Sequence, residues 1–363
     1  MKLGVEAALV EGVLVSGDVE IEDGRIAAVG LAGVGRGIAA PGLVDLHVHG
    51  FGGVDFSGAD ADGYRRAGEA LLETGVTAFQ PTFVTAPADE LVASLGQVPR
   101  GVVGPRVIGC HLEGPFLSPA RLGMHPEGAR REPDRELLER LLAAGPVTHM
   151  TLAPELEGAF DLVDLLVARG VTVACGHTDA RTPVAHAAFD RGAIHVTHLF
   201  NAMRPFAHRD PGIAGAALAR GDVTVELILD GNHLADETAR LTWRAAAGRV
   251  VLVTDALEAA GVGDGRWHLG AVEVEVRGGV ARLPESDVLA GSVLTMPEAV
   301  RALVRVGATL EQALDAAGRV PARVARRADL GTLAPGAAAD VVVLDDHLEV
   351  RRVLVGGAER VAA

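Results

Sequence analysis

The sequence predicts an α/β protein in which a (β/α)8, TIM-like barrel is joined to a small β-sandwich. Short apolar, β-branched runs alternate with amphipathic helical patterns between residues 43 and 255, and eight such runs occur. The two ends of the chain instead carry strand-like alternation punctuated by glycine. Alternating strands and helices favour a parallel sheet, and eight strands favour a closed barrel.

The barrel elements follow one another along the chain. Helices are predicted where apolar residues recur at helical spacing, as in 134–144, 157–169 and 296–306. A further hairpin is predicted near 267–283, "WHLGAVEVEVRGGVARL". The predicted strands are "LVDLHVH" (43–49), "VTAFQPT" (76–82), "RVIGCHLEG" (106–114), "VTHMTLAPE" (147–155), "VTVACGH" (171–177), "AIHVTHLF" (193–200), "VTVELILDG" (223–231) and "VVLVTDA" (250–256).

Two domains are predicted from this order. Residues 1–40 and 335–363 are expected to pair into the small β-sandwich domain, and residues 41–334 to form the barrel with the hairpin as an insertion. Both termini would then lie together beside the barrel.

Composition limits the partners. The 363 residues are 49% hydrophobic, which indicates a globular protein. The formal net charge of −15 argues against nucleic acid and anionic membrane as partners. No run approaches the roughly 18 apolar residues of a spanning helix, and the first residues lack a signal-peptide core, so we expect a cytoplasmic protein. Cys110 and Cys175 lie in apolar runs and are expected to be free thiols.

Lys2 is the only lysine of the chain. A Schiff-base lysine, a phosphate-loop lysine or a carboxylated bridging lysine would therefore have to be this terminal residue. The sequence indicates a mechanism that works without lysine.

Polar residues gather where the predicted barrel strands end. His47 and His49 are two residues apart on one strand, so their side chains point to the same face. In barrels of this kind the carboxyl ends of the strands carry the active site. The other residues so placed are Glu113, His177, His198, His233 and Asp255.

These residues together predict a metal site. Taken singly, His177 or His198 could be a hydrogen-bonded core histidine, and Glu113 or Asp255 could cap a turn or helix. Imidazoles and carboxylates that converge without a thiolate suit Zn²⁺, Fe²⁺ or Mn²⁺. The remaining histidines lack this placement and are expected to be structural or on the surface: His111, His149, His186, His195, His208, His268 and His347.

Eight motifs follow one another along the chain: "PGLVDLHVHGFGG" (41–53), "HLEGPFLSPARLGMHP" (111–126), "GHTDA" (176–180), "THLFNAM" (197–203), "RDPGIAGA" (209–216), "DGNHL" (230–234), "VTDA" (253–256) and "LAGSVLTM" (289–296). Together they resemble the amidohydrolase superfamily and, within it, the N-acetylglucosamine-6-phosphate deacetylase family, over essentially the whole chain. Most superfamily members hold metal with a carboxylated lysine, whereas these deacetylases resemble this chain in using a glutamate.

The resemblance implies one or two divalent ions per chain, Zn²⁺ above all, with Fe²⁺, Mn²⁺ or Co²⁺ as alternatives. It implies Glu113, His177 and His198 as ligands of one metal, and His47 and His49 as available for a second. It also implies a homodimer whose site is shared across subunits. The implied substrate contacts are Met124, His125, Asn201, Ala202, Arg209, His233, Leu289, Ala290 and Gly291.

The implied activity is hydrolysis of the acetamide of N-acetyl-D-glucosamine 6-phosphate to D-glucosamine 6-phosphate and acetate. Asp255 would be the general base and acid, and His125 would help to polarise the carbonyl. One departure concerns the loop: Met124 stands where relatives have a small residue, and Pro126 follows His125. The alternatives are the galactosamine isomer as substrate, a cyclic-amide amidohydrolase, a deaminase and a non-enzymatic scaffold.

Overall fold

The computed structural model describes residues 1–363 apart from Val34, Val103 and Ala363. Eight parallel strands form the barrel, which confirms the predicted fold class. The barrel closes where the N–H of Asp255 donates to the carbonyl of His47 at 2.8 Å. The barrel strands are β6 (Leu43–Val48), β9 (Val76–Val84), β12 (Cys110–Glu113), β13 (Val147–Leu152), β14 (Thr172–Cys175), β15 (His195–Val196), β16 (Thr224–Leu227) and β17 (Val250–Leu252).

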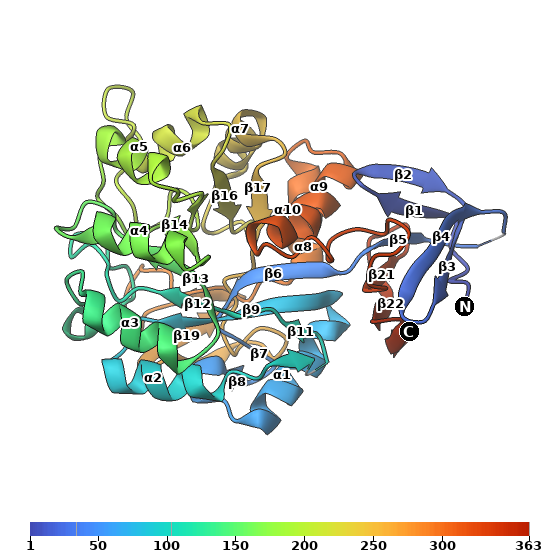
Figure 1. Cartoon of the computed structure of the whole chain (residues 1–363), viewed down its shortest axis with the longest axis horizontal. Helices are drawn as coiled ribbons and strands as arrows, with labels where there is room; N and C mark the ends of the chain where they lie inside the picture. Colours follow the sequence, from blue (N-terminus) through green and yellow to red (C-terminus); the bar gives the residue numbers. More distant parts are fainter. Residues whose placement is uncertain (34, 103, 363) are drawn as a thin grey trace.

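The helices lie around these strands (Figure 1). The segments 134–144, 157–169 and 296–306 form α3, α4 and α8, each shifted by no more than two residues from the predicted bounds. Helix α3 begins where the Asp134 carboxylate accepts two backbone N–H groups, which satisfies otherwise unpaired donors. The helices are α1 (Ala61–Glu73), α2 (Ala88–Gln97), α3 (Arg135–Ala144), α4 (Ala159–Ala168), α5 (Thr182–Asp190), α6 (Gly212–Ala219), α7 (Asp236–Ala246), α8 (Met296–Arg305), α9 (Leu310–Ala317) and α10 (Arg319–Val324).

Strands from both ends of the chain form a separate sheet, with the order β2–β1–β5–β21–β22–β23. Together with the β3–β4 pair it encloses its own apolar cluster, and both termini lie there (Figure 1). The domain boundaries stay a prediction, and Val34 and Ala363 of the predicted terminal segments lie outside the described residues. The strands are β1 (Ala7–Val10), β2 (Val13–Ser16), β3 (Asp18–Glu22), β4 (Arg25–Leu31), β5 (Ile38–Pro41), β21 (Val341–Leu344), β22 (Val350–Val355) and β23 (Ala358–Ala362).

The region predicted as a hairpin near 267–283 forms a three-stranded antiparallel sheet in the structure. Its apolar side chains, Leu269 among them, pack with Val84 at the end of β9. Among the described residues, none of the helices has the length and apolar character needed to cross a membrane. The remaining elements are β7 (Gly50–Phe51), β8 (Val54–Asp55), η1 (Phe56–Gly58), β10 (Gly101–Val102), β11 (Arg106–Val107), η2 (Glu127–Ala129), β18 (Gly265–Leu269), β19 (Val272–Arg277) and β20 (Val280–Arg282).

Candidate active site

Six of the predicted residues lie together at the carboxyl ends of five barrel strands. All are at most 6% exposed. Each belongs to the last two residues of its strand or follows the strand within three residues. We call them the ring residues: His47, His49, Glu113, His177, His198 and Asp255.

Three ring residues have a left-handed backbone. The φ angles are +46° at His177, +27° at His198 and +51° at Asp255. This conformation costs a residue with a Cβ about 1–3 kcal/mol, and it persists only where the surroundings impose it. Strain of this kind concentrates at functional sites, so the turns after β14, β15 and β17 support the placement of an active site here.

The first donor group consists of Glu113, His177 and His198. Oε1 of Glu113 is 3.1 Å from Nε2 of His177 and 2.9 Å from Nε2 of His198, and the two nitrogens are 3.1 Å apart. Nδ1 of His177 donates to the Arg121 carbonyl at 2.9 Å, so a neutral His177 turns its Nε2 lone pair toward the other two atoms. This donor set fits a divalent ion.

The second donor group consists of His47, His49 and Asp255. Nε2 of His47 and Nε2 of His49 are 3.2 Å apart, and Oδ1 of Asp255 is 3.3 Å and 3.0 Å from them. The Thr82 carbonyl accepts from Nδ1 of His49, and the Glu226 carboxylate accepts from Nδ1 of His47. Both Nε2 lone pairs are therefore directed to the same spot, as metal ligation requires.

The charges of the ring residues depend on one another. Burial alone would raise the pKa of Glu113, but the surrounding imidazoles, His47 first, hold that pKa well below its usual range. Burial would also raise the pKa of Asp255, and His47 again brings the net shift below the usual value. Burial lowers the pKa of His47, yet Asp255, Glu113 and Glu226 together raise it well above its usual value. The carboxylates are thus ionised, and a protonated His47 supplies positive charge among them when no metal ion is bound.

His125 lies against the first donor group as a hydrogen-bond donor. The Thr85 backbone N–H donates to Nδ1 of His125 at 3.2 Å, which leaves the ring proton on Nε2. That nitrogen lies 3.3 Å from Oε2 of Glu113. Burial, and then the nearby His177, lower the pKa of His125 to about 4, so the imidazole is neutral at pH 7.

A cavity of about 280 Å³ opens onto the ring residues. Its wall contains seven of the nine predicted substrate contacts; Ala290 is buried beside it, and Arg209 lies elsewhere. Nδ1 of His233 bonds to Asp230 at 2.9 Å, which fixes that imidazole in the wall. The structure adds lining residues that were not among the predicted substrate contacts: Gly123, Ile228, Leu269, Asp287 and Val288.

Arg209 stands apart from the cavity in its own chain. It is exposed in the loop between Ala207 and Asp210. Among the described residues, neither arginine nor lysine lines the cavity. The part of one chain that the structure describes therefore offers no permanently cationic side chain to an anionic substrate in this cavity.

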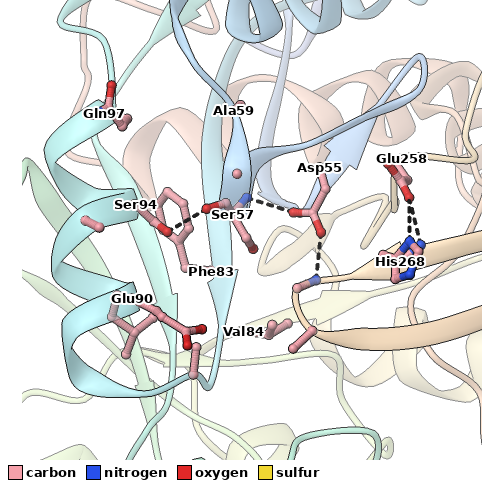
Figure 2. Close-up of a pocket in the computed structure, with 16 residues that line it drawn as sticks. Asp55, Ser57, Ala59, Phe83, Val84, Glu90, Ser94, Gln97, Glu258 and His268 are labelled. Carbon is pink, nitrogen blue, oxygen red and sulfur yellow. Dashed lines mark hydrogen bonds and ion pairs between the residues drawn. The ribbon is translucent and has the colours of Figure 1, made fainter.

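A second cavity, of about 610 Å³, lies between α2 and the β18–β19 turn (Figure 2). Two of its three carboxylates have partners: Asp55 accepts from the N–H of Gly270 and Glu258 from that of His268, both at 2.7 Å, and Glu90 is the third. These two bonds flank Leu269 and hold its strand against the substrate cavity.

Glu226 on β16 is a buried residue that sequence reasoning missed. Its carboxylate accepts from Nδ1 of His47 and the N–H of His198, both at 3.1 Å, and lies 3.0 Å from Nε2 of His195. It connects two ring residues to His195, whose ring lies 5.3 Å from that of His149, which in turn stacks on His111. These three buried residues are the inner histidines: His111, His149 and His195. Alternation within "VTVELILDG" was the only available signal, since Glu226 is the one charged residue in its apolar strand.

Known proteins share both this fold and its sequence. A model described as the amidohydrolase family matches residues 38–360. The chain is 41% identical over 340 residues to N-acetylglucosamine-6-phosphate deacetylase from Homo sapiens, covering 89% of this chain and 83% of the relative. It is 38% identical over 360 residues to N-acetylgalactosamine-6-phosphate deacetylase from Escherichia coli O157:H7, covering 96% and 95%.

A solved structure agrees with these relatives. A point mutant of N-acetyl-D-glucosamine-6-phosphate deacetylase from Mycobacterium smegmatis, in complex with N-acetyl-D-glucosamine-6-phosphate, superimposes with a TM-score of 0.95. It is 37% identical, and the match covers 100% of this chain and 99% of that one. The chain therefore belongs to the amidohydrolase family, in the branch formed by these sugar-phosphate deacetylases.

Proposed function

We propose that the protein hydrolyses the acetamide of N-acetyl-D-glucosamine 6-phosphate to D-glucosamine 6-phosphate and acetate. The observation that carries this proposal is the convergence of Glu113, His177, His198 and Asp255 on the floor of a small cavity. The relatives from Homo sapiens and Mycobacterium smegmatis carry this activity in their names, and the second was solved with this sugar phosphate bound.

Glu113, His177 and His198 would hold one divalent ion, and His47 with His49 would hold a second when two are bound. Imidazole and carboxylate donors suit Zn²⁺, with Fe²⁺, Mn²⁺ and Co²⁺ as alternatives. A bound ion would act as a Lewis acid toward the acetamide carbonyl and would lower the pKa of water toward 7.

Asp255 would move the proton. Because its pKa lies below the usual range, its carboxylate is ionised at neutral pH and can accept a proton from the attacking water. The water oxygen bonds to the carbonyl carbon, Asp255 returns the proton to the amide nitrogen, and the carbon–nitrogen bond breaks. Acetic acid and the amine are released, the proton of the acid passes to the amine to give acetate, and Asp255 is again a carboxylate.

His125 would stabilise the developing oxyanion. Its Nε2–H, fixed by the Thr85 N–H on the other nitrogen, is a preorganised donor. The carbonyl oxygen of the substrate would replace Glu113 as the acceptor of this hydrogen bond. Its neutral state suits the task, since a neutral imidazole donates without giving up its proton.

The simplest test follows acetate release from a panel of sugars. N-acetylglucosamine 6-phosphate is expected to be the best substrate, and the unphosphorylated sugar a poor one. N-acetylgalactosamine 6-phosphate is the second candidate substrate, because the name of the Escherichia coli relative states that it deacetylates this sugar phosphate. Faster release from the galacto isomer would select that alternative, and no release from either phosphate would contradict the proposal.

We further propose that a second copy of the chain supplies Arg209 to the phosphate. The cavity of one chain lacks arginine among the described residues, and a bidentate guanidinium suits a phosphate. Arg209→Ala is expected to weaken processing of the 6-phosphate by about 2–3 kcal/mol and to leave the unphosphorylated sugar nearly unaffected.

Mixed dimers decide whether the site is shared. Arg209→Ala co-expressed with Asp255→Asn gives hybrids in which one site has both an intact Asp255 and the other chain's Arg209. Random pairing would then restore about a quarter of wild-type activity. Mixed dimers that show no recovery would place Arg209 in its own chain's site.

A further inference from the structure

A groove of about 650 Å³ lies at the junction of the terminal sheet and the barrel, away from the substrate cavity. It is built from β4, from α10 and the turn after it, and from the segment that leads to β21. Five arginines line it, in a chain whose net charge is −15. We call it the arginine groove: Arg25, Arg319, Arg323, Arg326 and Arg327.

Three of these arginines lack a carboxylate partner among the described residues. Arg319 pairs with Asp315 and Arg327 with Asp329, whereas the other three form no ion pair there. Arg25 donates to the Gly336 carbonyl at 2.8 Å, and Arg323 donates to the Gly248 carbonyl at 3.2 Å.

Arg326 is the least paired of the five. Its side chain is exposed, and it makes neither a hydrogen bond nor an ion pair with any other residue that the structure describes. Arg25, Arg323 and Arg326 therefore keep N–H donors available for a ligand.

The backbone at Arg326 is a second, independent observation. Its φ is +57°, in the left-handed region. The N–H of Arg327 reaches back to the Ala322 carbonyl at 2.8 Å, so Arg326 occupies the helix-ending position where glycine is usual. A long cationic side chain there carries strain that glycine or asparagine would avoid, and such outliers are a reason to look for function.

The lining also limits the chemistry of a ligand. Planar guanidinium forks match phosphate oxygens in pairs. Two carboxylates also line the groove, Glu11 and Asp329, and Arg327 pairs with Asp329, so the five guanidinium groups outnumber the acidic groups. The rest of the wall is Thr332, Leu330, Gly336 and four alanines, and the described lining holds no aromatic side chain for stacking a base. The volume is that of a small-molecule site.

We propose that the arginine groove binds a small soluble anion that carries two phosphate groups. Arg326 and Arg323 contact one phosphate, and Arg25, from the terminal sheet, contacts the other. The ligand thereby bridges the terminal sheet and the barrel.

Fructose 1,6-bisphosphate is a suitable probe, because it has two separated phosphates. Titration calorimetry at low salt on the metal-loaded protein is expected to show one site per chain. Fructose 6-phosphate is expected to bind at least about tenfold more weakly, since each lost charge-assisted pair costs about that factor. Equal affinity for the monophosphate, or no saturable binding at millimolar concentration, would overturn the proposal.

A double variant and a matched double control locate the site. Arg326→Asn and Arg323→Gln together are expected to weaken bisphosphate binding at least about tenfold. The control, Arg65→Gln with Arg66→Gln on α1, removes the same charge from an exposed surface elsewhere and is expected to leave binding unchanged. Equal losses in both double variants would mean only a general charge effect and would refute the site.

Arg326→Asn alone separates binding from folding. Asparagine tolerates the left-handed backbone, so this variant is expected to melt at the wild-type temperature or above it while binding the bisphosphate more weakly. Unchanged affinity for the bisphosphate in this variant would show that Arg326 does not contact the ligand. Tighter binding of a short DNA or RNA duplex than of the bisphosphate would replace the proposed ligand class.

Discussion

The barrel contains two groups of buried histidines, and they differ in where their lone pairs point. In the ring, Nε2 of His47 faces Nε2 of His49 at 3.2 Å, and Nε2 of His177 faces Nε2 of His198 at 3.1 Å. The inner histidines instead bond to hydroxyl, amide or carboxylate groups. His111 reaches Thr151 at 2.7 Å, for example.

The comparison shows that burial and residue type do not identify a metal site. A buried imidazole is stable when both nitrogens find partners, and most nitrogens of the inner histidines do. Facing lone pairs repel each other unless a cation or proton lies between them. His149, His195 and Glu226 also lie close enough to form a possible donor group, but Nε2 of His195 already bonds to Glu226.

The largest expected effect lies in the ring. Asp255→Asn keeps the shape of the side chain but removes its ability to carry a proton, so turnover should fall by roughly 10²–10⁴. Steady-state kinetics measure this loss, and metal analysis checks that the ions remain. A variant with near-normal turnover would show that another group moves the proton.

The next effect concerns metal content. Glu113→Gln removes the charge shared by two imidazoles, so the protein should lose most of its bound divalent ion, measured by elemental analysis after gel filtration. His149→Gln, among the inner histidines, is the matched control and should retain the wild-type content. Equal loss of the ion in Glu113→Gln and His149→Gln would show that the ring residues and the inner histidines do not differ in metal binding. Chelators should inactivate the wild type, and bicarbonate should not affect it, because no carboxylated lysine is involved.

Much of this arrangement could be predicted from the sequence, for stated physical reasons. The period-two alternation of "VDLHVH" places His47 and His49 on one face, and the barrel brings strand ends together wherever they occur in the chain. Glu226 could not be found this way, since its importance comes from contacts with residues 28 and 179 positions away. Nor could the third strand of the inserted sheet, because "VARL" is too short to be recognised without its partner β19.

Glu226→Gln tests the link between the two groups. The amide oxygen can still accept a hydrogen bond from His47, but it lacks the negative charge that orients the imidazole of His47 and raises its basicity as a metal ligand. Affinity for the ion at His47 and His49 should fall about tenfold, the lower end of the range for such supporting residues. Competition with a chromophoric chelator measures it. An unchanged affinity, with the fold intact by circular dichroism, would make Glu226 merely structural.

The last effect concerns the inner histidines, and it changes stability while turnover and metal content stay as they are. Burial, and then the nearby His195, lower the pKa of His149 to about 3, whereas the unfolded chain has the ordinary value of 6.5. Below pH 6.5 the unfolded state therefore binds a proton that the folded state does not. The free energy of unfolding should fall on this account by about 1.4 kcal/mol per pH unit down to pH 3.

In metal-free protein, His149→Gln should remove this contribution, so its unfolding free energy should decline less steeply between pH 6 and pH 4. Urea unfolding at several pH values measures the difference. His347→Gln, at an exposed position, is the control and should keep the wild-type slope. Parallel curves for wild type and His149→Gln would mean that His149 accepts a proton inside the folded barrel. The contrast between the two histidine groups would then rest on geometry alone.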